Sequence, residues 1–206
     1  AAFYAWITLR KGRWGEALKG GRRILVCDVG GGTSDFSLMQ GLEEGENFNF
    51  ERVAVGAHLL LGGDNVDLAL AHFAESKLSG KRGKLNASQW HLLAQLARKA
   101  KETLLTDPEL NEVTLRLPGS GRKVIGGLRQ ATLTRDELNK LVLDGFFPTL
   151  SKDYQSKKSA GLAEMGLPYE SEPAITWHVL DFIKKHGTDE DYPDWVLFNG
   201  GSLEPQ

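Results

Sequence analysis

Two acidic residues flank a glycine-rich turn near the start of the chain. Asp28 follows an apolar run, residues 24–27, that predicts a buried strand; glycines 30–32, Thr33 and Asp35 come next. Glycine permits positive φ and lets backbone N–H groups approach a ligand closely, an arrangement that suits phosphate. The two carboxylates could hold a hydrated Mg²⁺ or orient an attacking water. The structural alternative is a plain tight hairpin in which Asp35 makes turn hydrogen bonds.

Alternating strand and helix patterns surround this turn. Helices are predicted where apolar residues recur every three or four positions, and strands where they run together or alternate. Asp64 or Asn65 is expected to cap one helix, Asn86 or Ser88 the next, and Thr134 a third through a capping box with Glu137. The predicted strands are residues 24–28, 36–39, 48–55, 113–117, 123–133 and 195–198, and the predicted helices are residues 1–9, 66–78, 88–104, 134–150 and 174–186.

This order of elements predicts an α/β protein in two parts. Residues 1–63 and 174–206 are expected to form one α/β lobe, and residues 64–150 a smaller inserted α+β subdomain. Residues 151–173 contain two glycines and two prolines and are predicted to be a connection or an insertion. The basic stretch from Lys11 to Arg23 is interpreted as a solvated loop, with anion binding as the alternative.

Composition is that of an ordinary globular protein. The chain has 206 residues, 41% of them hydrophobic and 25% charged, with a net charge of −2. This balance gives no electrostatic reason to expect nucleic acid or an anionic membrane as a partner. No apolar run approaches the roughly 18 residues of a membrane span. Cys27 is the only cysteine, so an internal disulfide is excluded, and a buried inert thiol and a cytoplasmic location are expected.

Four segments carry a resemblance to a known family. Residues 28–38, DVGGGTSDFSL, resemble the second phosphate motif of the DnaK-type seventy-kilodalton heat-shock chaperones, in the actin and sugar-kinase ATPase superfamily. Residues 61–67, LGGDNVD, resemble that family's LGGEDFD turn, and residues 97–104, ARKAKETL, its adenosine-contacting helix. Residues 196–202, VLFNGGS, resemble its last strand and adenosine motif. The chain is therefore similar to lobe II of that ATPase domain, which implies a ribonuclease-H-like lobe with an inserted subdomain.

The resemblance implies a nucleotide site with Mg²⁺ and ATP or ADP as ligands. It makes Asp28 and Asp35 the catalytic carboxylates, with Asp28 near the metal through water. It places the sugar contact at Lys101. The nucleotide-binding residues that it implies are Gly30, Gly31, Gly32, Thr33, Gly63, Asp64, Arg98, Lys101, Leu105, Gly200, Gly201 and Ser202.

The adenosine half of this site departs from the family pattern. Arg98 stands where the family has Glu, and Leu105 where it has Ser. The last motif continues as Leu203 and Glu204, where the family has Thr and an Arg that stacks on adenine. Altered nucleotide selectivity is therefore an open alternative.

The function implied is that of part of a chaperone nucleotide-binding domain, in which ATP hydrolysis by water drives a conformational change. The chain alone is expected to be inactive, because the first phosphate hairpin and the catalytic Lys of lobe I are not in its sequence. Expected partners are nucleotide, lobe I, a peptide-binding domain, co-chaperones and client polypeptides, with no nucleic acid and no membrane. One alternative is a non-enzymatic regulatory or assembly module with weakened adenosine binding, and another is a small-molecule kinase of the same superfamily.

The remaining polar and aromatic residues are given structural interpretations. The five histidines have no metal-ligand spacing, so a ligand role is not expected for any of them. Trp90, Trp177 and Trp195 fall at helix or strand positions and are predicted to be core or groove residues.

Overall fold

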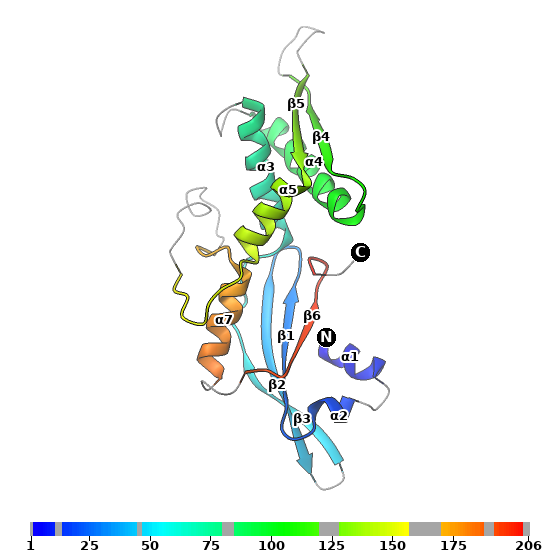
Figure 1. Ribbon diagram of the computed structural model, residues 1–206, viewed down its shortest axis with the longest axis vertical. Helices are drawn as coiled ribbons and strands as arrows, with labels where there is room; N and C mark the ends of the chain where they lie inside the picture. Colours follow the sequence, from blue (N-terminus) through cyan, green and yellow to red (C-terminus); the bar gives the residue numbers. More distant parts are fainter. Residues whose placement is uncertain are drawn as a thin grey trace. The chain divides into compact units, whose positions relative to one another are not determined.

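The computed structural model describes residues 2–10, 14–44, 47–79, 85–119, 128–156, 170–187 and 192–203. The chain divides into two compact units (Figure 1). Unit 1 comprises Ala1–Gly63 and Thr149–Pro205, and unit 2 comprises Asp64–Pro148. Each unit has its own sheet and helices, so the protein is of the mixed α/β class that the order of elements predicts.

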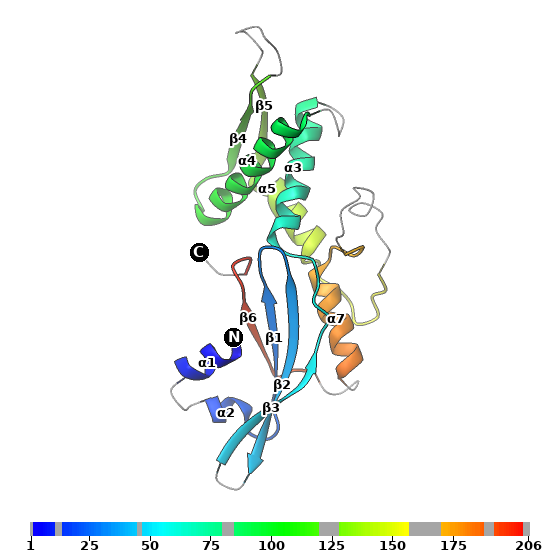
Figure 2. The same ribbon diagram turned by 180° about the vertical axis from the view of Figure 1, so that it is seen from behind.

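Unit 1 is built on a mixed four-stranded sheet. The strands are β1 (Arg23–Val29), β2 (Ser34–Glu44), β3 (Asn47–Val55) and β6 (Trp195–Asn199), and their order across the sheet is β3-β2-β1-β6 (Figure 2). The first three form the predicted antiparallel meander, while β6 pairs parallel with β1. Parallel pairing requires a long crossover between the strands. Here the whole of unit 2 lies in the sequence between them.

Helices pack on both faces of this sheet. On one face, α1 (Ala2–Leu9) and α2 (Trp14–Leu18) bury Phe3 and Leu18 against Ile24, Val26 and Met39. On the other face, Phe182 of α7 (Ile175–His186) lies 6.1 Å from Phe36 of β2, measured between ring centroids. The helix α2 corrects the prediction of a loop between Lys11 and Arg23. The burial of Leu18 in the core, at 1% exposure, supplies the stabilisation that this short helix lacks by itself.

The burial predicted for β6 is wrong. Its side chains Trp195, Val196 and Phe198 are 52%, 46% and 63% exposed. The physical reason is that β6 is an edge strand, which within the described residues pairs with β1 alone, so an apolar sequence does not by itself guarantee a covering layer.

Unit 2 packs two long helices beside a two-stranded antiparallel sheet. Its elements are α3 (Gly63–Ser79, which begins at the last residue of unit 1), α4 (Ala87–Thr106), β4 (Glu112–Leu117), β5 (Arg129–Thr134), α5 (Arg135–Asn139) and the π-helix η1 (Lys140–Asp144). The predicted capping box at Thr134 is present, and the cap predicted at Asn86 or Ser88 is Asn86, which also forms a capping box. Asn86 accepts from the N–H of Gln89, and Thr134 accepts from that of Glu137. The fully buried side chains of these helices and strands include Leu70, Leu93, Leu104, Leu117 and Leu133.

Two predicted helix ends in unit 2 are wrong. The helix α3 begins at Gly63, before Asp64 and Asn65, and the Gly63 N–H, which has no acceptor within the helix, donates to the Gly30 carbonyl at 3.1 Å. The helix predicted to reach residue 150 passes through the π-turn η1 and ends at Phe146. Pro148 accounts for this end, since proline disfavours helical conformation in the residue before it.

Parts of two predictions lie outside the described residues. For the strand predicted over residues 123–133, residues 120–127 are not described. The connection predicted over residues 151–173 has no helix in residues 151–156 and 170–173, and residues 157–169 are not described. Among the helices that are described, none is both long and apolar enough to cross a membrane.

Candidate functional site

The glycine turn joins β1 to β2 at one end of the unit 1 sheet. Asp28 and Asp35 are register partners on the two strands, and the Gly30 N–H donates to the Thr33 carbonyl at 2.8 Å, which closes the turn. The next three N–H groups, those of glycines 31 and 32 and of Thr33, donate no hydrogen bond within the described part of the chain. Unpaired N–H donors at a sheet end are suited to an anion, because they carry partial positive charge and are already fixed in place.

A second segment, residues 59–63, holds this turn from one side. Ser34 and Leu59 exchange two backbone hydrogen bonds, of 3.0 and 3.1 Å. The Ser34 hydroxyl, which is fully buried, donates to the Leu61 carbonyl at 2.7 Å. Together with the Gly63 N–H bond to Gly30, these contacts fix the turn by backbone geometry.

A third segment, the turn that follows β6, holds it from the other side. The Ser202 N–H donates to the Val29 carbonyl at 3.2 Å, and its hydroxyl donates to the Gly30 carbonyl at 2.9 Å. Asn199 is the register partner of Asp28. Three glycine-containing turns that are far apart in the sequence therefore meet in unit 1, and we call residues 30–33, 62–63 and 200–202 the glycine cradle.

Close backbone approach explains two glycines of this cradle, Gly62 and Gly200. An added Cβ on Gly62 would lie 2.5 Å from the Gly30 carbonyl oxygen, and one on Gly200 would lie 2.3 Å from that of Val29. Gly200 also has a φ of 93°. Glycines 30–32 do not use the positive φ that glycine permits, since the described glycines with positive φ are Gly20, Gly21 and Gly200. Glycine is required at these positions more because the backbones are too close for a Cβ than because of a left-handed conformation.

The two carboxylates differ in their surroundings. Asp28 is half-buried beside Gly200, whereas the Asp35 side chain is 52% exposed and its Oδ1 lies 2.7 Å from Nδ1 of His58. This histidine was expected to have no ligand role, and residue spacing gave no signal of its contact, which depends on the bridge between Ser34 and Leu59. No group of three or more metal-ligating side chains is present among the described residues. A pair of carboxylates still suits Mg²⁺, which keeps several waters and takes substrate oxygens as its other ligands.

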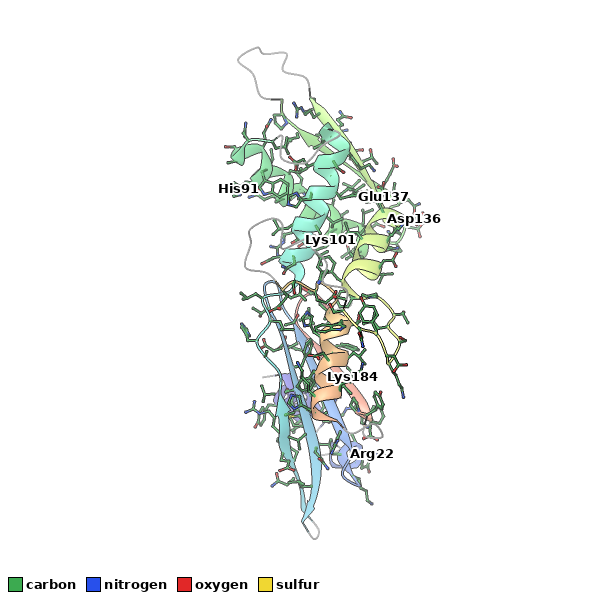
Figure 3. All side chains as sticks on the ribbon, turned by 90° about the vertical axis from the view of Figure 1, so that its left-hand side faces the viewer. Arg22, His91, Lys101, Asp136, Glu137 and Lys184 are labelled. Atoms are coloured by element: carbon green, nitrogen blue, oxygen red, sulfur yellow. The ribbon has the colours of Figure 1, made fainter. Side chains whose placement is uncertain are left out.

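The remaining predicted site residues belong to unit 2, where the two cations among them, Arg98 and Lys101, lie beside carboxylates of the same unit. Lys101 lies on α4 (Figure 3). Its Nζ is 2.6 Å from the Asp67 carboxylate of α3. Arg98 Nε lies 3.0 Å from Glu102, and its guanidinium is 4.0 Å from Asp64. Burial raises the pKa of Asp67, and Lys101 opposes this shift without overcoming it. These cations already have carboxylate partners.

Leu105 and Glu204 complete the account of the adenosine half. Leu105 is 53% exposed on α4, so it presents an apolar surface where a polar contact was implied. Glu204 lies outside the described residues.

Two further features of unit 1 lie away from the cradle. Cys27 is 2% exposed, as expected for an inert core thiol, and burial raises its pKa to about 12. A cavity of about 430 Å³ is lined by Trp6, Arg10, Arg22 and Trp195, among others. It adjoins the start of β1 and β6, the opposite end of these strands from Asp28 and Asn199.

The fold and the cradle define a mixed α/β protein whose principal sheet ends in a cluster of backbone-held glycine turns and acidic side chains. A model of the family described as Hsp70 protein matches residues 12–163, which is most of the chain. The chain therefore belongs to the Hsp70 family, a family of heat-shock chaperones, and the resemblance noted in its motifs is confirmed.

Proposed function

We propose that this chain is lobe II of an Hsp70-type nucleotide-binding domain and that the glycine cradle binds the β- and γ-phosphates of ATP. The observation that carries the proposal is a set of three consecutive N–H groups that have no acceptor among the described residues, in a turn held by hydrogen bonds from two other segments. Donors fixed in this way need no rearrangement when they meet a phosphate, so the binding free energy is not spent on ordering them.

The chemistry would be hydrolysis by water. A water oxygen attacks the γ-phosphorus, the bond from that phosphorus to the bridging oxygen breaks, and backbone N–H groups stabilise the charge on the phosphate oxygens. Asp35 would accept a hydrogen bond from the water, and the proton that the water loses would pass to the inorganic phosphate formed. Asp28 would hold a hydrated Mg²⁺ through its water ligands. When bound, Mg²⁺ would neutralise charge on the β- and γ-phosphates.

The wider assignment follows the family. We propose a ribonuclease-H-like lobe for unit 1, an inserted subdomain for unit 2, and a cytoplasmic location. Lobe I, a peptide-binding domain, co-chaperones and client polypeptides are the proposed partners, and hydrolysis needs lobe I.

Calorimetric titration of the full-length protein with Mg²⁺ and ATP, ADP, AMP or adenosine tests the proposal. If the cradle supplies the affinity, ADP and ATP should bind at least tenfold more tightly than AMP, a difference of about 1.4 kcal/mol. Equal affinity for ADP and adenosine would contradict it, because adenosine carries no phosphate for the N–H groups to bind.

A second candidate function is favoured by the ion pairs of unit 2. Lys101 and Arg98 are engaged by Asp67 and Glu102, and Leu105 is apolar and exposed. A non-enzymatic regulatory module with weakened adenosine binding fits these contacts. An affinity for ATP and ADP weaker than about 1 mM, corresponding to about −4 kcal/mol, would favour this second function.

A further inference from the structure

The contact between His58 and Asp35 is set by backbone pairing. Ser34 and Leu59 form an antiparallel bridge, so the residue after Ser34 lies opposite the residue before Leu59. These two residues are Asp35 and His58, and Nδ1 of the ring lies 2.7 Å from Oδ1 of the carboxylate. The pair is therefore part of the same framework that holds the glycine turn.

The pair has a defined hydrogen-bond direction. An ionised carboxylate can only accept hydrogen bonds. Nδ1 of His58 is therefore the protonated ring nitrogen, and its N–H donates a hydrogen bond to Oδ1. This bond occupies Oδ1 and limits rotation of the carboxylate, and Oδ2 has no hydrogen-bond partner within the described part of the chain.

Stability alone does not account for the pair. The side chains of His58 and Asp35 are 62% and 52% exposed, and ion pairs between exposed groups contribute little to folding because water screens them. The pair's position is more informative, since Asp35 lies two residues after Thr33, whose N–H is unpaired, and opposite Asp28 on β1.

We propose that His58 is a positioning residue for Asp35. By donating to Oδ1, it turns Oδ2 toward the water that attacks the γ-phosphorus, and it is itself unchanged by the reaction. The inference rests on the proposed ATPase function and adds to it a residue that acts through Asp35 without touching the nucleotide.

The test compares two substitutions of His58 in the full-length protein. His58→Leu removes the donor, whereas His58→Asn keeps an N–H donor at the position of Nδ1. We expect His58→Leu to lower the single-turnover rate of ATP hydrolysis about tenfold through lost orientation, with the Kd for Mg²⁺ and ATP within about twofold of wild type. His58→Asn should recover most of the lost rate.

A double-mutant cycle separates positioning from a general structural effect. If His58 acts through Asp35, His58→Leu should cause no further loss of rate in the Asp35→Asn background, because the effects of coupled residues are not additive. Full additivity would overturn the inference, as would a wild-type rate in His58→Leu. A parallel fall in ATP affinity and Tm in both His58 variants would also overturn it. The binding of ATP to the wild-type protein is measured first, before any variant is compared. If the wild-type protein does not bind ATP, the proposed function itself is overturned.

Discussion

Replacing Gly62 by alanine should weaken phosphate binding by displacing the glycine turn. The added Cβ would lie 2.5 Å from the Gly30 carbonyl oxygen and 2.6 Å from that of Gly31. Carbon and oxygen do not approach within 3.0 Å here without strain, so the turn has to move by about half an ångström. Overpacking of this kind costs about 1–3 kcal/mol of stability.

The same displacement acts on the unpaired N–H groups. Hydrogen bonds to charged groups are worth about 2 kcal/mol, so losing the alignment of one of them should weaken ADP binding roughly thirtyfold. Calorimetric titration of the full-length variant with Mg²⁺ and ADP measures this change, and thermal unfolding should show Tm lowered by roughly 3–10 °C.

Gly145→Ala is the matched control for this substitution. Gly145 has helical backbone angles, with φ −88° and ψ −45°, and nothing lies within 4 Å of an added Cβ. Gly145 lies in unit 2 and is not one of the predicted site residues. The Gly145→Ala variant should therefore bind ADP with the same affinity as the wild-type protein. Wild-type Tm and affinity in Gly62→Ala would refute the reasoning, because the contact between segments 59–63 and 30–33 would then not hold the turn.

Three further predictions follow from the same structure. The chain without lobe I should show negligible ATPase activity, and measured turnover that Asp28→Asn abolishes would contradict this. Cys27 should resist maleimide in the folded state, since a pKa raised from 9.0 to about 12 lowers the thiolate fraction about a thousandfold, and should react on unfolding in urea. Burial would raise the pKa of Glu137, but hydrogen bonds from Lys77 and Thr134 outweigh burial and lower that pKa below 4.5. The ionised Glu137 therefore stabilises the folded state above pH 4.5, and this contribution is lost as the pH falls through the folded pKa. Glu137→Gln should therefore cost about 1 kcal/mol at pH 7 and much less near pH 3, as measured by urea unfolding.

Local signals account for the features that sequence predicted well. The meander of β1–β3 follows from apolar runs separated by turn residues, and the capping box at Thr134 follows from residues three positions apart. Such features depend on hydrogen bonds within a few residues, so they survive in any fold that keeps the segment. The family likewise follows from four short motifs in order, and the match over residues 12–163 confirms it.

Contacts between distant segments decided the rest. The sequence shows that glycines occur in all three segments of the cradle. Only the tertiary structure shows that Gly62 and Gly200 must be glycine, because their backbones lie too close to the end of β1 and the turn after it for a Cβ. The Gly63 N–H at the start of α3 donates to a carbonyl 33 positions earlier in the sequence, and no local pattern predicts this contact.

The sequence by itself determined the types of residue at the candidate phosphate site, because glycines and carboxylates around one turn are a local property. The tertiary structure decided which partners these residues have. Asp35 gains His58 through a backbone bridge, Lys101 gains Asp67 through the packing of two helices, and β6 remains exposed because it has one neighbour. Each of these outcomes depends on strand order or helix packing, which short-range spacing does not encode.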